Sequence, residues 1–336
     1  MGLIKDILYK TSNKQMLGVV KNQSIFPYYH LVNNKDVTHI KHLYQFKNIE
    51  KFKQDLDTLL KYYKPLDPSL FTNTRTKIII PKNHFLLTFD DGLSEIYNII
   101  FPILKQKGIN AVFFINPDFI DNNESLYKHD LSIIIESLKT SHYKKNTIDK
   151  IVKILGIETN TSLPQLTTTI KQIKQSQNNI IEDIADLLNI DLYQYIETHK
   201  PYLSKSQIQE MIHSGFYFGG HTMSHPRLLE LSIEKQKKEV IDSIKWLKTN
   251  FNIDYSFFAF PFSDKGISKA LINEIFKYDE SAVIFGNSGI KKDVNNRIIQ
   301  RFSLENPNKH TEKQIVTENL YKYYNKAIGK YKIKRN

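Results

Sequence analysis

Two adjacent carboxylates, Asp90 and Asp91, are the first residues in the chain whose types point to chemistry. They end an apolar run in the stretch HFLLTFDDGLSEIY, residues 84–97. Two ionised acids side by side repel each other unless a positive group lies nearby. The pair is therefore either a polar turn at the end of a strand or one half of a metal site.

Two histidines four positions apart, His221 and His225, form the second feature, in the stretch GGHTMSHP. This spacing places two side chains on one face of a helix, but Pro226 disfavours helical geometry at His225. A strand end followed by a tight turn is the better prediction, and such a turn can still bring two imidazoles together. The spacing alone is weak evidence, since chance or a core histidine explains it about as well.

The carboxylate pair and the histidine pair together indicate a metal site. One aspartate and two histidines are a common ligand set for a borderline divalent cation, and they leave positions open for water and substrate. Coordination by one carboxylate would also relieve the repulsion and leave the other ionised as a base. The hypothesis requires both pairs to lie at the same end of one fold.

The elements around these residues alternate between strands and helices. Residues 84–116 are typical of a strand–helix–strand unit, with Pro102 as a flaw inside the helix 94–108. The carboxylate pair lies at the C-terminal end of the first strand, which is where ligands bind in parallel sheets and barrels. Further strands are expected at 24–30, 77–81, 216–226, 256–262, 281–286 and 297–305, and further helices at 48–65, 204–215, 232–251, 267–278 and 311–328. Such a series of βα units indicates the α/β class, as a single barrel or sheet.

The segment 118–203 differs from the rest, because it is rich in Asn, Lys, Thr and Ile and carries only helical patterns. We expect a mostly helical insertion that packs on the main domain. The predicted organisation is residues 1–117 as the N-terminal part of the barrel, 118–203 as the insertion, and 204–336 as the C-terminal part of the same barrel with a terminal helix.

Composition excludes several classes of protein. The 336 residues are 40% hydrophobic and 12% aromatic, as in a globular chain with a core, and no cysteine is present to form disulfides or thiolate sites. The net charge of +12 is spread along the chain, and no nucleic-acid-binding pattern accompanies it, so we expect no nucleic-acid partner. No signal peptide and no transmembrane stretch is visible, which makes the cytoplasm the expected location. The oligomeric state is left open.

The stretches TFDDG and HTMSH closely resemble the first two signature motifs of the polysaccharide deacetylases, the NodB-homology family of carbohydrate esterases. The resemblance covers roughly 77–116 and 204–305. It implies a distorted (β/α) barrel that removes N-acetyl groups from an amino-sugar glycan or glycan precursor. Carried over by position, Asp90 is the general base, while Asp91, His221 and His225 bind the metal, which is usually zinc in this family.

The chain departs from the family pattern in its third motif, where an arginine normally orients the base. Here AFPF puts Ala259 at that position, and Arg301, near a later strand end, is our candidate for the missing guanidinium. The following residues, Phe260, Pro261 and Phe262, are expected to contact substrate. By resemblance, the backbone N–H of Phe262 would stabilise the oxyanion.

The family's late histidine motif, which supplies the general acid, is also absent. His30, at the end of the first strand, is our substitute candidate. We expect three further histidines to be solvated, namely His39, His42 and His129.

Two other functions remain open. The same fold could hydrolyse a non-sugar or cyclic amide, which ring opening of a cyclic ureide would reveal. A glycan-binding module with a decayed catalytic site would also explain the missing arginine and acid, although the intact Asp90, Asp91, His221 and His225 argue against decay.

Overall fold

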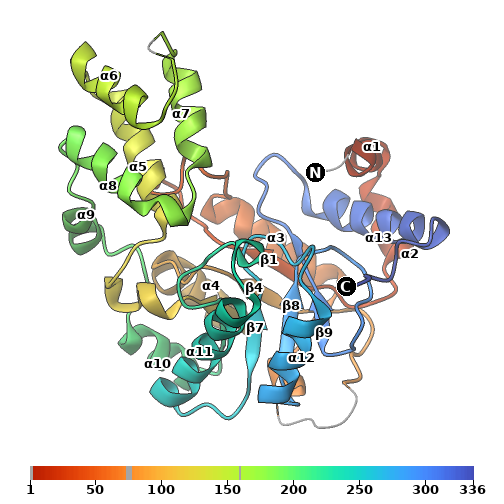
Figure 1. Ribbon diagram of the computed structural model, residues 1–336. Helices are drawn as coiled ribbons and strands as arrows, with labels where there is room; N and C mark the ends of the chain where they lie inside the picture. Colours follow the sequence, from red (N-terminus) through yellow and green to blue (C-terminus); the bar gives the residue numbers. More distant parts are fainter. Residues whose placement is uncertain (1–2, 73–77, 159) are drawn as a thin grey trace.

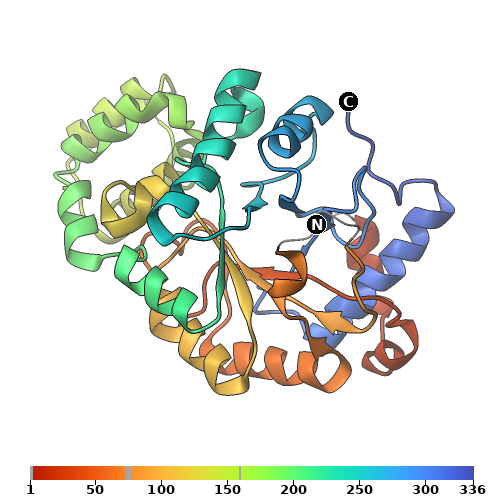
Figure 2. The same cartoon turned by 90° about the horizontal axis from the view of Figure 1, so that it is seen from below.

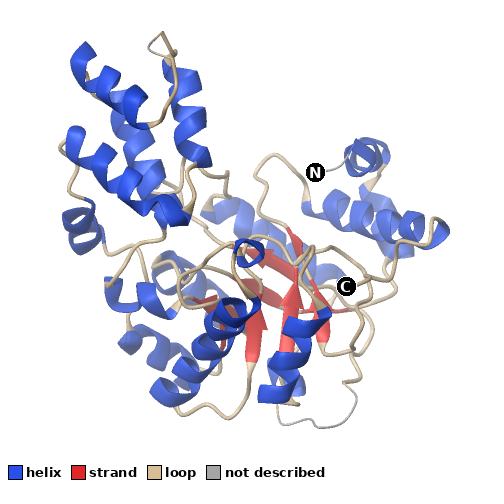
Figure 3. Ribbon diagram, in the orientation of Figure 1, coloured by secondary structure: helices blue, strands red, loops and turns tan. Residues whose placement is uncertain are grey.

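Eight short parallel strands form one curved sheet at the centre of the molecule, and the sheet closes almost completely into a barrel (Figure 3). The computed structural model describes residues 3–72, 78–158 and 160–336. Across the sheet the strands follow the order β10–β1–β4–β5–β6–β7–β8–β9. Their bounds are β1 (Pro27–Tyr29), β4 (Leu87–Phe89), β5 (Ala111–Ile115), β6 (Tyr217–Gly220), β7 (Phe257–Ala259), β8 (Val283–Gly286), β9 (Ile298–Gln300) and β10 (Phe302–Ser303). The predicted α/β barrel is confirmed.

The segment 298–303 belongs to both edges of the sheet and so closes the barrel. β9 pairs with β8, whereas β10 pairs with β1 at the opposite edge. Arg301 is the residue between the two strands, and its backbone N–H donates to the Gly286 carbonyl at 3.1 Å. Arg301 therefore lies at the barrel seam, and its side chain is buried.

The register of the central strands aligns the residues that follow them. Tyr29 at the end of β1 is the partner of Phe89 at the end of β4, so His30 and Asp90 leave neighbouring strands at the same level. The backbone N–H of Asp90 donates to the Tyr29 carbonyl at 3.0 Å, and that of His221 donates to the Ile115 carbonyl at 2.9 Å. Parallel pairing thus carries the polar residues to one end of the barrel.

Helices surround the barrel because each buries one apolar stripe against it (Figure 2). On α11 the buried side chains are Val240, Ile241, Ser243, Ile244, Leu247 and Phe251. The surrounding helices are α3 (Ile49–Tyr62), α4 (Phe101–Lys107), α10 (Lys205–His213), α11 (Ile233–Phe251), α12 (Lys269–Tyr278) and α13 (Thr311–Ala327). Two N-terminal helices, α1 (Leu3–Thr11) and α2 (Leu17–Val20), pack against α13.

The insertion forms a helical body with its own hydrophobic core, and it projects beyond the barrel at the upper left of Figure 1. Its core also takes up Leu31, Val37 and Ile40 from the segment after β1, which fastens it to the barrel. Its helices are α5 (Tyr127–Thr140), α6 (Lys145–Ile154), α7 (Leu163–Gln172), α8 (Asn178–Leu187) and α9 (Leu192–His199).

Short elements complete the chain. One two-stranded sheet joins β2 (Lys64–Pro65) to β3 (His84–Phe85). The short helical segments are η1 (Lys14–Met16), η2 (Pro68–Phe71), η3 (Ile96–Ile100), η4 (Pro117–Asn122), η5 (Gln175–Gln177) and η6 (Leu228–Glu230). No helix within the described ranges has the length and apolar character needed to span a bilayer.

Two local strand predictions were wrong. Residues 78–81 of the expected strand 77–81 form no strand, since Ile78 is buried in the core without pairing to an edge, and Lys77 lies outside the described residues. The strand 84–89 is divided at Leu86 between β3 and β4. The helix predicted at 94–108 is confirmed. It consists of the π-helical turn η3 and then α4, with Pro102 just after their junction and Gly108 as the left-handed C-cap.

Candidate active site

The three predicted metal ligands lie together at the C-terminal end of the barrel. Asp91 Oδ1 is 3.2 Å from His225 Nε2 and 3.5 Å from His221 Nε2. One ligand atom from each residue lies within 4.8 Å of the others, and all three side chains are buried. The structure therefore brings residues 130 positions apart in the sequence to the spacing of a coordination sphere.

The donor set fits a divalent cation. Asp91 Oδ1 is buried and has no hydrogen-bond partner within the described chain. The His221 Nδ1–H donates to the Ala259 carbonyl at 2.8 Å, which leaves the Nε2 lone pair facing Asp91. Such an outer hydrogen bond fixes the tautomer of a metal-ligating histidine. Burial lowers the pKa of His225 despite the nearby Asp91 and so favours the neutral imidazole that binds metals.

Backbone strain gathers around this cluster. Four non-glycine residues there have positive φ: Asp91 at 72°, Thr222 at 68°, His225 at 55° and Phe262 at 54°. A residue held in this region costs about 1–3 kcal/mol and persists only where its surroundings fix it. The strain points to a site whose loops are held in one geometry.

The loop that carries His225 is held from two sides. The Glu239 carboxylate on α11 accepts hydrogen bonds from the backbone N–H of Met223 at 2.9 Å and of Ser224 at 3.0 Å, and from the Ser224 hydroxyl at 3.1 Å. From the insertion, Gln175 Nε2 donates to the Ser224 carbonyl at 3.1 Å. The sequence reasoning missed Glu239, because no local pattern links a mid-helix glutamate to a loop 15 residues earlier.

Asp90 is bound by Arg301. The guanidinium donates two hydrogen bonds to the carboxylate, from Nη1 to Oδ1 at 2.7 Å and from Nη2 to Oδ2 at 2.9 Å. It also donates to Thr88 Oγ1 and lies between the rings of Tyr28 and Phe114, with its carbon 5.0 and 5.1 Å from their centroids. Burial disfavours the charge on Asp90, but Arg301 outweighs burial and holds the pKa of the carboxyl below its ordinary value. Asp90 is therefore an ionised, oriented acceptor beside the predicted metal ligands.

His30 is paired with Glu305, a residue that the sequence reasoning missed. His30 Nδ1 lies 2.8 Å from Glu305 Oε2, while Oε1 accepts from the backbone N–H groups of His30 and Leu31, each at 2.8 Å. Burial alone would lower the pKa of His30, but the Glu305 carboxylate raises it to about 10. The imidazole is therefore protonated near neutral pH. The missed signal was a carboxylate two positions after the end of β10, similar to the strand-end position that marked Asp90.

A cavity of about 360 Å³ connects these groups. Phe260 and Phe262 line it, whereas Pro261 is buried and is not one of its lining residues. The Phe262 ring is 38% exposed and meets the His225 ring edge-on, with centroids 4.6 Å apart. The remaining lining residues are Tyr28, His30, His42, Leu43, Tyr44, Asp90, Asp91, Leu126, Lys128, His129, Lys171, His221, His225 and Asn287. The insertion thus contributes one wall of the cavity, which the sequence did not predict in detail.

The expectation that His39 and His129 are solvated was wrong. Both are buried, because the insertion core closes over them, and their ring centroids lie 5.2 Å apart. His129 Nδ1 lies 2.7 Å from the Tyr202 hydroxyl. His42 is half-buried, with its Nε2 2.7 Å from Glu136.

Comparisons with known proteins agree with this fold. Residues 78–279 match the family described as polysaccharide deacetylase. The fold is similar to that of the Streptococcus pyogenes deacetylase PplD solved with acetate, with a TM-score of 0.55, 16% identity, and coverage of 89% of this chain and 99% of that one. It is also similar to IcaB from Ammonifex degensii, with a TM-score of 0.52, 16% identity, and coverage of 89% and 97%. No curated protein matches the sequence.

Proposed function

Because this chain belongs to the polysaccharide deacetylase family, we propose that it hydrolyses the N-acetyl group of an amino sugar with the help of a bound divalent cation. One observation carries the proposal. The buried Asp91, His221 and His225 converge beside Asp90, whose carboxylate Arg301 keeps ionised. The substrate would be a glycan or a glycan precursor.

Zinc is the cation that this ligand set suits best. Two neutral imidazoles and one carboxylate are typical of catalytic zinc sites, which keep a position open. A bound zinc ion would polarise the acetamide carbonyl and lower the pKa of a water molecule toward neutrality.

The residues of the chain would move the protons. Asp90, fixed by two hydrogen bonds from Arg301, accepts a proton from the attacking water. The backbone N–H of Phe262 stabilises the developing oxyanion from the rim of the cavity. His30, protonated because of Glu305, donates a proton to the departing amine. The products are acetate and a free amino sugar.

The experiment is a comparison of two substrate classes. The zinc-loaded protein is incubated with N-acetylglucosamine oligomers and, separately, with a cyclic ureide, and the release of acetate and the opening of the ring are measured. We expect acetate only, and its loss in Asp90→Asn. Ring opening without acetate release would favour the cyclic-amide alternative. Oligomer binding without either reaction would favour a decayed glycan-binding module.

A further inference from the structure

The residues that follow α13 fold back onto the barrel. They run past the loop between β8 and β9, where the backbone N–H of Lys292 donates to the Tyr331 carbonyl at 3.1 Å. They then reach the start of α12, where the backbone N–H of Lys269 donates to the Asn336 carbonyl at 2.7 Å (Figure 2). We call residues 331–336 the C-terminal segment. No step of the proposed reaction uses it.

One side chain of this segment, Arg335, is buried between two carboxylates. Its Nη2 donates to Asp264 Oδ2 at 2.7 Å and to Asp293 Oδ2 at 2.6 Å, while its Nε donates to Asp293 Oδ1 at 2.8 Å. Its Nη1 donates to the backbone carbonyl of Asp264 at 3.0 Å. The Arg335 side chain is 1% exposed, and both carboxylates are 0% exposed. The two aspartates therefore form a buried site that a planar guanidinium fills.

Asp264 also holds together the loops that follow β7 and β8. Its Oδ1 accepts a hydrogen bond from the Ser288 hydroxyl at 2.8 Å, and its backbone N–H donates to Asn287 Oδ1 at 3.2 Å. Asn287 Nδ2 in turn donates to the Phe262 carbonyl at 2.8 Å. Phe262 and Asn287 both line the active-site cavity. A short series of contacts therefore leads from Arg335 to the residue whose N–H is the proposed oxyanion donor.

The charge of Asp264 depends on its hydrogen-bond donors. Burial alone would raise the pKa of this carboxyl, but hydrogen bonds from Gln300, Ser288 and Arg335 outweigh burial and hold the pKa below its ordinary value. Gln300 Nε2 donates to Oδ2 of both Asp264 and Asp293, at 2.8 Å each. Loss of Arg335 would leave two buried carboxylates that share one amide and repel each other. We therefore expect the loop of Asp264 to shift without it.

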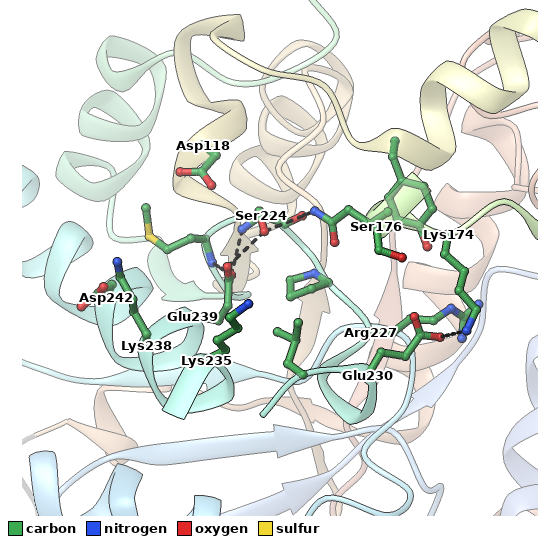
Figure 4. A pocket seen from close by; sticks show the side chains of 15 residues that line it. Asp118, Lys174, Ser176, Ser224, Arg227, Glu230, Lys235, Lys238, Glu239 and Asp242 are labelled. Atoms are coloured by element: carbon green, nitrogen blue, oxygen red, sulfur yellow. Dashed lines mark hydrogen bonds and ion pairs between the residues drawn. The ribbon is translucent and has the colours of Figure 1, made fainter. Parts of the chain in front are cut away.

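Two loops at the active-site cavity are thus held by buried contacts of different origin. The loop that carries His225 is held by Glu239 on α11, as Figure 4 shows. The loop that carries Phe262 is held through Asp264, whose guanidinium partner comes from 71 positions away. Phe262 has a φ of 54°, a strained value that persists only where the surroundings fix it. Its conformation is therefore sensitive to loss of a distant contact.

We propose that Arg335 is a positioning residue for the deacetylation, because its contacts with Asp264 and Asp293 hold the backbone N–H of Phe262 where the oxyanion forms. Arg335 does not line the active-site cavity, and it acts through Asp264 and Asn287. The inference rests on the proposed function and adds that the C-terminal segment has to be docked for full turnover.

The test measures acetate release from N-acetylglucosamine oligomers by the zinc-loaded protein. It compares the wild type, Arg335→Ala, Arg335→Lys and, as the control, Lys334→Ala, which changes an exposed neighbour in the same segment. Arg335→Ala should lower kcat about 10–100-fold and keep the bound zinc, because a displaced oxyanion donor weakens binding of the transition state. Arg335→Lys keeps the charge without the planar fork and should fall in between. Lys334→Ala should keep the wild-type kcat.

Chemical rescue distinguishes a positioning role from a general loss of structure. Methylguanidinium should enter the site between Asp264 and Asp293 in Arg335→Ala and restore kcat, whereas methylammonium, with the same charge and no planar fork, should not. If Arg335→Ala does not fold, Arg335→Lys carries the test, and a wild-type kcat in that variant would overturn the proposal.

Amide hydrogen exchange of the same proteins reports on the loops without any reaction. The backbone N–H groups of Asp264 and Asn287 should exchange about tenfold faster in Arg335→Ala and slow again with methylguanidinium. An unchanged kcat in Arg335→Ala, or no recovery with methylguanidinium, would overturn the role of Arg335 and leave the proposed function intact. Absence of acetate release even in the wild type, together with the expected exchange rates, would overturn the proposed function and support the docking of the loops by Arg335.

Discussion

The ion pair between Asp90 and Arg301 offers the most quantitative prediction. Replacement of Arg301 by methionine keeps most of the side-chain volume between Tyr28 and Phe114 but removes the guanidinium. Arg301 is 0% exposed and Asp90 is 4% exposed, so water cannot take the place of the lost partner. The buried carboxylate would then have no cation to hold its pKa low.

The expected magnitude follows from the burial of both groups. Removal of one partner of a buried ion pair costs about 3–5 kcal/mol, because the other charge is left uncompensated. Replacement of both partners by neutral groups is often close to neutral in stability. We therefore expect Arg301→Met to lower the free energy of unfolding by about 3–5 kcal/mol, and the double variant Asp90→Asn with Arg301→Met to recover at least about 2 kcal/mol of that loss.

The assay is a double-mutant cycle by urea unfolding, with acetate release measured on each folded variant. General base catalysis contributes about 10²–10⁴-fold, so a base that is neither oriented nor ionised should lower kcat at least about 10²-fold. Arg301→Lys keeps the charge but cannot form the two parallel hydrogen bonds, and it should fall in between. A stable Arg301→Met protein with unchanged turnover would refute the assigned role of Arg301.

Three further predictions concern groups around the site. The proton donor must be protonated, so the activity of the wild type should fall as pH rises through about 10, the pKa of His30. Glu305→Gln should move this basic limb of the pH–rate profile down toward about 6.5, the ordinary histidine value. A limb that does not move would contradict the proposed role of the His30–Glu305 pair. Glu239→Gln removes the charge from the side chain that accepts three hydrogen bonds from Met223 and Ser224 in the loop that carries His225. It should weaken zinc binding about 10–100-fold in a chelator competition. A far-UV circular dichroism spectrum like that of the wild type serves as the control for folding. A Cβ at Gly219 would come within 2.6 Å of the Phe114 ring, so Gly219→Ala should destabilise the barrel by about 1–3 kcal/mol, whereas Gly18→Ala, with no atom within 4 Å of its Cβ, should be neutral or stabilising in the same thermal unfolding experiment.

The cluster of Asp91, His221 and His225 could be predicted because its sequence signals are local. Asp91 lies two positions after the apolar strand β4, His221 directly follows β6, and His225 comes four positions later. Parallel pairing places all such strand ends at one end of the barrel, so the fold class alone was enough to bring distant residues together. The φ values that bring the imidazoles into position could not be read from the sequence, since they depend on loop contacts such as those of Glu239.

The partners of the catalytic candidates depend on closure of the barrel. Arg301 is 211 positions from Asp90, and Glu305 is 275 positions from His30. Both contacts exist because the segment from β9 to β10 crosses from one edge of the sheet to the other. Strand ends indicated Arg301 as a candidate, but only the seam shows that its guanidinium meets Asp90. Ala259 could not reveal this contact, because the absence of an arginine at that position does not indicate which residue binds Asp90 instead.

The most direct test of the central claim measures metal content and acetate release in the same preparations of the wild type, Asp91→Asn and Asp90→Asn. If Asp91 is a ligand and Asp90 is the base, Asp91→Asn loses both the bound metal and the activity, whereas Asp90→Asn keeps the metal and loses only the activity. Full metal occupancy in Asp91→Asn, or full activity in Asp90→Asn, would contradict this division of roles between the two adjacent carboxylates.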